Sequence, residues 1–246
     1  MFGEHRERGL TRREALVRGA AALAFAGAAP RMASAANPVP QSPGLPEGPY
    51  WLDGMPLRAN IKSNSSTGAV QAGFPLRLVL HVTRLQSDLL APVVGARVDV
   101  WHANPFARYS GIPIQGTDGQ DFLRGHQFTN IHGNVDFETI YPGWELERTP
   151  HIHFRVRLYS GDVVTYEFVS QLFFDEAVTS SVFETEPYLS HVGRETFVEP
   201  FNSTDPVFIG PSVGPGGTVA SNAGQHMMLT LAKRSDRVLG LFNVVL

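Results

Sequence analysis

Residues 148–155 read Arg-Thr-Pro-His-Ile-His-Phe-Arg and place two imidazoles two positions apart in a predicted β-strand. Successive side chains of a strand point to opposite faces, so His151 and His153 share one face with Arg155, while the apolar residues between them share the other. A histidine that only fills the core would lie on the apolar side. Because neutral imidazole is the commonest protein metal ligand, two imidazoles at this spacing can converge on one ion. The run therefore predicts a strand with a candidate metal site.

Alternation of apolar residues with period 2 predicts strands at residues 76–82 and 97–101. Further strands are expected at residues 135–140, 151–159, 163–174, 226–233 and 238–244, separated by Gly and Pro. Only residues 175–183 indicate a short helix, with Asp175 as its N-cap. A succession of strands with almost no helix predicts an all-β fold, a β-sandwich with long loops and little helix.

Two segments lack this alternation. The Pro-rich residues 37–49 predict an extended arm, and the Gly- and Pro-rich residues 208–224 predict a surface loop. The sequence shows no internal repeat and no sign of a second domain.

The composition is that of a globular protein, with 43% apolar and 17% charged residues. A formal net charge of −3 gives no reason to expect nucleic acid or an anionic membrane as a partner. The sequence contains no cysteine, so any metal must be held by nitrogen and oxygen donors. Such donors favour a hard or borderline ion. The sequence leaves a homo-oligomer open.

The first 35 residues have the character of an export signal. A basic start precedes the Ala-rich residues 19–29, which are apolar but too short to span a bilayer, and residues 33–35 form an A-x-A cleavage site. Arg12 and Arg13 predict the twin-arginine route, which is associated with passengers that fold before export. We therefore expect residues 1–35 to be removed and residues 36–246 to form one domain that acts outside the cytoplasm, in the periplasm or beyond.

Several motifs follow one another in a fixed order. They are VDVWHAN at 98–104, RYSG at 108–111, FLRG at 122–125, GNVDFETIYPGW at 133–144, the histidine pair, and QLFFD at 171–175. Together they resemble the intradiol ring-cleavage dioxygenases, the family of protocatechuate 3,4-dioxygenase and catechol 1,2-dioxygenase. The likeness is greatest to secreted, single-domain bacterial members and extends from residue 47 to the C-terminus.

The resemblance implies a non-haem Fe(III) ion held by two tyrosinates and two histidines on a β-sandwich. Carried onto this sequence, the first tyrosine is Tyr109 and the histidines are His151 and His153. A phenolate oxygen is a hard, strongly donating ligand and suits the ferric ion. Arg148 matches an arginine that stabilises charge on the activated ring, and Gln171 matches a glutamine on the following strand.

The second tyrosine of the family pattern is missing. The pattern T-I-x-P-G-x-Y reads Thr-Ile-Tyr-Pro-Gly-Trp-Glu over residues 139–145, so Glu145 occupies the tyrosine position. A carboxylate is also a hard anionic ligand, but its ordinary pKa of about 4.3, against about 10 for tyrosine, makes it a much weaker base. Glu145 is the expected fourth ligand, with Tyr141 and water as the alternatives.

The function implied by the resemblance is that of an exported dioxygenase. It would insert both atoms of O₂ into a catechol-type small molecule and open the ring between the two hydroxylated carbons. The alternative is a non-catalytic, secreted binding protein that lost the second tyrosine ligand, and iron content separates the two. A serine-hydrolase motif at 210–214 is excluded by the Pro-Gly-Gly that follows it, and a zinc hydrolase fits Tyr109 poorly.

Overall fold

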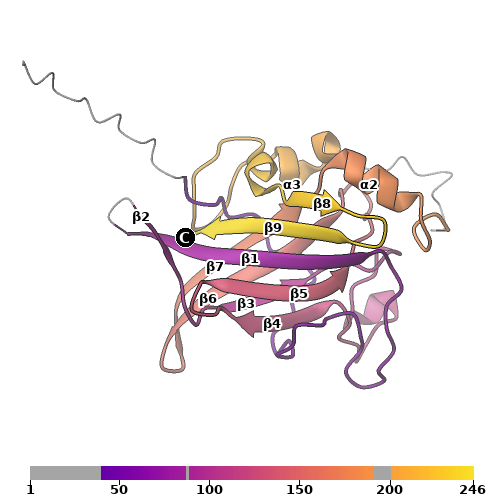
Figure 1. Cartoon of the computed structure of the whole chain (residues 1–246), viewed down its shortest axis with the longest axis horizontal. Helices are drawn as coiled ribbons and strands as arrows, with labels where there is room; N and C mark the ends of the chain where they lie inside the picture. Colours follow the sequence, from indigo (N-terminus) through magenta and orange to yellow (C-terminus); the bar gives the residue numbers. More distant parts are fainter. Residues whose placement is uncertain (1–39, 87–88, 191–200) are drawn as a thin grey trace, which may run out of the picture. The chain divides into compact units, whose positions relative to one another are not determined.

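Two β-sheets hold most of the regular secondary structure of the described residues (Figure 1). The computed structural model describes residues 40–86, 89–190 and 201–246, so the expected export signal lies outside the described residues. The strands are β1 Pro75–Gln86, β2 Leu89–Pro92, β3 Arg97–Trp101, β4 Arg124–Phe128, β5 Asn134–Ile140, β6 His151–Ser160, β7 Val163–Phe173, β8 Thr230–Lys233 and β9 Val238–Val245. The helices are α2 Glu176–Phe183 and α3 Pro206–Ile209, with 3-10 turns η1 Pro113–Gln115, η2 Asn202–Thr204 and η3 Ala223–Met227.

The sheets form the two layers of a β-sandwich. One has five strands in the order β2-β1-β9-β8, with β5 also pairing with β1, and the other has the order β4-β3-β6-β7. In Figure 1, β1, β5 and β9 pass in front of β3, β6 and β7. The all-β prediction is confirmed.

The core lies between the two sheets because alternate residues of the central strands β1, β3 and β6 are apolar. Leu78 and Leu80 of β1 share one buried cluster with Val98 of β3 and with Ile152 and Phe154 of β6. Full burial of one such side chain stabilises the fold by about 1.5–3 kcal/mol. The helix predicted after Asp175 is also present as α2, and the Asp175 side chain accepts a hydrogen bond from the Val178 N–H at 3.1 Å.

The first seven residues of strand β6 are buried on both faces. The described residues of the arm predicted at 37–49 cover the face that carries the histidines, with Gly48 beside the His153 ring. The arm has no regular secondary structure over its described residues. The Leu45 N–H donates to the Val169 carbonyl at 3.2 Å, and the Ser170 hydroxyl donates to the Pro43 carbonyl at 2.9 Å. A site on this face is therefore shielded from water by a segment about 100 positions earlier in the chain.

The structure corrects several predicted boundaries. The strand predicted at 226–233 begins only at Thr230, because η3 occupies its first residues. The predicted loop at 208–224 is packed at both ends, since Phe208 is buried in α3 and a Cβ on Gly224 would lie 2.5 Å from the Phe208 ring. Strands β2 and β4 were not predicted; β2 is short, and the residues of β4 do not alternate.

The described residues bear on the serine-hydrolase motif and on membrane-spanning helices. The segment at 210–214 follows helix α3 and not a strand, so it lacks the context of a hydrolase elbow. No helix in the described part of the chain is long and apolar enough to cross a membrane.

Candidate metal centre

The two histidines lie at the start of β6, and strand register fixes their neighbours. His153 is paired with Trp101 of β3 on one side and with Gln171 of β7 on the other. The rings of Trp101 and His153 stack with centroids 5.0 Å apart. His151 Nδ1 lies 2.7 Å from the Thr149 carbonyl, which can only accept, so this nitrogen carries the proton and the Nε2 lone pair is available to a ligand.

Four donor atoms from three segments of the chain converge beside these rings. The Tyr109 hydroxyl donates to Glu145 Oε1 at 2.6 Å and lies 3.4 Å from His151 Nε2 and 3.2 Å from His153 Nε2. The two Nε2 atoms are 3.0 Å apart, and His151 Nε2 is 3.5 Å from Glu145 Oε1. The structure thus brings together the four residues that the sequence predicts as metal ligands.

The donor set fits a metal ion. Nitrogen and oxygen ligands at about 2.0–2.2 Å from an ion stand roughly 3–3.5 Å from one another. Four of the five separations in this cluster lie between 3.0 and 3.5 Å, and the fifth is the 2.6 Å hydrogen bond from Tyr109 to Glu145. Burial lowers the pKa of His151 and of His153 well below the ordinary value, so both rings are neutral and can ligate. Within the described residues, no group of three or more His, Asp and Glu side chains alone is placed to hold a metal ion.

Tyr109 is held rigidly in a buried loop. Its N–H donates to Gln115 Oε1 at 2.6 Å, and its carbonyl accepts from the Thr117 hydroxyl at 2.5 Å. Burial, and next the Glu145 carboxylate, raise the pKa of Tyr109 well above its ordinary value. A phenolate at this position would therefore require a nearby cation, and a metal ion held by this cluster would supply that charge.

Glu145 is brought to the cluster by a tight turn in which backbone bonds join it to Arg148 in both directions, at 3.3 and 3.1 Å. Glu147 completes the turn with φ of 63°. Tyr141 lies elsewhere: its hydroxyl is 2.7 Å from the Thr179 hydroxyl of α2, and its ring packs on Phe174. The geometry favours Glu145 over Tyr141 as the fourth ligand.

Arg148 and Gln171 are joined to each other and to a third residue that sequence reasoning missed. The Arg148 Nε–H lies 3.0 and 2.9 Å from the carboxylate oxygens of Asp205, and the Arg148 Nη2–H donates to Gln171 Oε1 at 2.5 Å. Gln171 in turn donates to the Pro46 carbonyl at 2.6 Å. Asp205 is 57 positions from Arg148, and no motif near it indicated a role.

The arm forms a wall of the centre, which was also missed. The ring of Tyr50 lies 4.6 Å from the ring of Tyr109. Gly48 has φ of +76°, and a Cβ there would come within 3.1 Å of His153 Cε1. Glu47 forms an ion pair with Arg155, and the Arg155 guanidinium lies 3.8 Å from the centroid of the Trp51 ring. These contacts hold the arm against the histidine face of β6.

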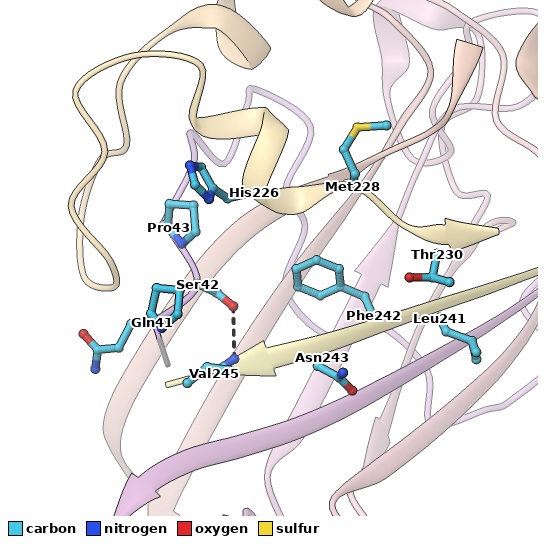
Figure 2. Close-up of a pocket in the computed structure, with 11 residues that line it drawn as sticks. Gln41, Ser42, Pro43, His226, Met228, Thr230, Leu241, Phe242, Asn243 and Val245 are labelled. Carbon is cyan, nitrogen blue, oxygen red and sulfur yellow. Dashed lines mark hydrogen bonds between the residues drawn. The ribbon is translucent and has the colours of Figure 1, made fainter. Parts of the chain in front are cut away.

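Two surface cavities lie apart from the centre. Figure 2 shows a groove of about 400 Å³ beside β9, where the Val245 N–H donates to the Ser42 hydroxyl at 3.0 Å. Another, of about 550 Å³, is lined by residues that include Asp175, Asn202 and Phe208. Neither is lined by any of the four donor residues or by Arg148, so the chemistry is located by the donor cluster and not by these hollows.

The chain is similar to known proteins both in sequence and in structure. No family model matches the chain. The chain is 29% identical over 129 residues to chlorocatechol 1,2-dioxygenase of Pseudomonas putida, an alignment that covers 45% of this chain and 46% of the relative. It is 30% identical over 129 residues to chlorocatechol 1,2-dioxygenase of Pseudomonas sp. strain P51, with 45% and 48% covered. The matched region thus spans about half the length of these curated relatives.

Solved structures extend the likeness to nearly the whole described fold. An intradiol ring-cleavage dioxygenase of Tetranychus urticae superposes with a TM-score of 0.68 at 27% identity, over 84% of this chain and 94% of that one. The chain is related to the intradiol ring-cleavage dioxygenases. A dioxygenase domain from Streptomyces sp. SirexAA-E, part of a fusion with a carbohydrate-binding protein, matches with a TM-score of 0.54 at 25% identity. The intradiol resemblance predicted from the motifs is confirmed.

Proposed function

We propose that the chain is an oxygen-dependent intradiol dioxygenase whose non-haem ferric ion is held by Tyr109, Glu145, His151 and His153. The observation that carries this proposal is the convergence of four donor atoms, with separations of 2.6 to 3.5 Å, in a relative of catechol dioxygenases. The substrate would be a catechol-type diol. One O₂ is consumed per ring, the bond between the two hydroxylated carbons breaks, and both oxygen atoms enter the two new carboxyl groups.

A ferric ion in this centre would supply Lewis acidity that favours the deprotonated diol, together with the redox partner that reaction with O₂ requires. The chain's own residues then determine access and charge. The side chains of Glu145 and Arg148 are 20% and 18% exposed, whereas Tyr109 and the histidines are buried. A substrate therefore approaches from the side of Glu145 and Arg148. There the positive charge of the Arg148 guanidinium would stabilise a diol anion.

The remaining walls exclude water. Tyr50 lies against Tyr109, Gly48 lies over His153, and Trp101 stacks on the His153 ring. A dry site strengthens the attraction between Arg148 and an anionic ring. Gln171 acts here by holding the Arg148 guanidinium.

Oxygen incorporation tests the proposed reaction. Iron-loaded protein is incubated with catechol and a series of substituted catechols under ¹⁸O₂, and the products are identified by mass spectrometry. We expect one O₂ consumed per ring and a dicarboxylic product that carries two ¹⁸O atoms. Iron-loaded protein that consumes no O₂ with any of these diols refutes the reaction. Protein that binds catechols without retaining iron would instead favour the non-catalytic binding protein.

We propose further that the chain is exported by the twin-arginine route. Support comes from the pair Arg12 and Arg13, the Ala-rich residues 19–29 and the A-x-A site at 33–35. Export of an already folded protein suits a centre assembled from distant parts of the chain, because the ion can be inserted before transport.

A further inference from the structure

Asp205 is a fully buried carboxylate whose hydrogen-bonding capacity is saturated. Besides the Arg148 Nε–H, it accepts from the Thr149 N–H at 3.0 Å and from the Val207 and Phe208 N–H groups at 2.8 and 3.1 Å. A carboxylate has about four acceptor positions, and all are used. Asp205 thus joins the first turn of α3 to the two residues that lead into the histidine strand.

These contacts fix the plane of the Arg148 guanidinium. Its Nε is held by Asp205 and its Nη2 by Gln171, which is itself held by Pro46. Among the described residues, Nη1 makes no hydrogen bond and remains available to a ligand. A planar cation held on two sides presents its third side in one direction, which is the arrangement that electrostatic stabilisation requires.

We propose that Asp205 is a positioning residue for ring cleavage: it orients Arg148 toward the bound diol and does not touch the substrate itself. This inference rests on the proposed function. A purely structural role would require only that Asp205 compensate a buried charge. The chain offers a matched comparison in Asp99, also fully buried, which accepts from Arg97 at 2.8 Å and from Arg157 at 2.9 Å.

The experiment measures kcat, KM, iron content and the unfolding midpoint for the wild type and for Asp205→Asn, Arg148→Ala, the double variant and Asp99→Asn. Asparagine keeps an acceptor for the α3 N–H groups but loses the charged, two-oxygen contact with Arg148. A misplacement of about 1 Å can cost about 10²-fold in rate, so we expect Asp205→Asn to lower kcat by about that factor at unchanged iron content. In the Arg148→Ala background the same change should lower kcat no further. Asp99→Asn should lower the unfolding midpoint but keep kcat.

Wild-type kcat in a folded Asp205→Asn protein overturns the inference, as does an equal loss of kcat with and without Arg148. If Asp205→Asn does not fold, Asp205→Glu is measured in its place, because it keeps the negative charge and displaces the carboxylate by one methylene. An unchanged kcat in Asp205→Glu also overturns the inference. A wild-type protein that cleaves no catechol overturns the proposed function and this inference with it. Active wild type with an indifferent Asp205 overturns this inference alone.

Discussion

Replacing Tyr141 with Phe separates the two tyrosines that the sequence offered as ligands. The Tyr141 hydroxyl is bonded to Thr179 at 2.7 Å, and the Thr179 hydroxyl also lies 3.0 Å from the Asp175 carbonyl, so it keeps a partner in the variant. Phenylalanine retains the ring that packs on Phe174 and opens no cavity. The loss is therefore one net hydrogen bond, about 0.5–1.5 kcal/mol. For a domain of this size, that is a fall of about 2–4 °C in Tm for each kcal/mol.

The assay is urea unfolding together with iron content and visible spectrum, measured for Tyr141→Phe and for Tyr109→Phe as the matched buried tyrosine. Tyr141→Phe should lower stability by about 1 kcal/mol and leave iron and colour unchanged, whereas Tyr109→Phe should remove the phenolate-to-iron band. Loss of iron or of colour in Tyr141→Phe would refute the placement of Tyr141 outside the centre.

Three further outcomes are expected. Glu145→Ala should weaken iron retention and Glu145→Tyr should add a second phenolate band; full iron and unchanged turnover in Glu145→Ala would mean that Glu145 is not a ligand. Burial lowers the pKa of His102 to about 4, so the unfolded state takes up the proton first. The free energy of unfolding therefore falls as pH falls from about 6.5 toward 4, by about 1.4 kcal/mol per pH unit. His102→Gln should show a shallower dependence of this free energy on pH, and an equal dependence would contradict the lowered pKa of His102. Replacing Arg12 and Arg13 with Lys should leave an uncleaved precursor in the cytoplasm, whereas normal export would show that the pair has no special role.

The strands could be predicted because their alternation follows directly from the two faces of a sheet. Residues 151–159 carry an apolar side chain at every second position from Ile152 to Leu158, and residues 135–137 begin the same alternation. Residues 135–140 and 151–159 both become strands almost at the predicted bounds. Strand β4 gives no such signal. It is polar and contains Gly125, whose missing side chain makes room for Ile61, so tertiary packing and not local pattern determines it.

The donor residues could be predicted for a different reason. His151 and His153 share a face by strand geometry, while Tyr109 and Glu145 were identified by motif likeness and are joined to them only by the fold. Their convergence depends on a buried loop and a tight turn that no local pattern encodes.

The rest of the centre could not be read from the sequence, because it depends on contacts between distant segments. Asp205 looks like an ordinary helix cap before Pro206, and its bond to Arg148 appears only in three dimensions. Likewise, the arm was predicted as extended, but nothing in its composition indicated that Gly48 would lie over His153 or that the adjoining Tyr50 would lie against Tyr109.

The most direct test of the central claim is the metal content and visible spectrum of the purified protein, measured beside Tyr109→Phe. The donor cluster predicts about one iron per chain and a visible phenolate-to-Fe(III) absorption that Tyr109→Phe removes. Stoichiometric zinc in place of iron, or a colour that survives Tyr109→Phe, would contradict the assignment of this centre.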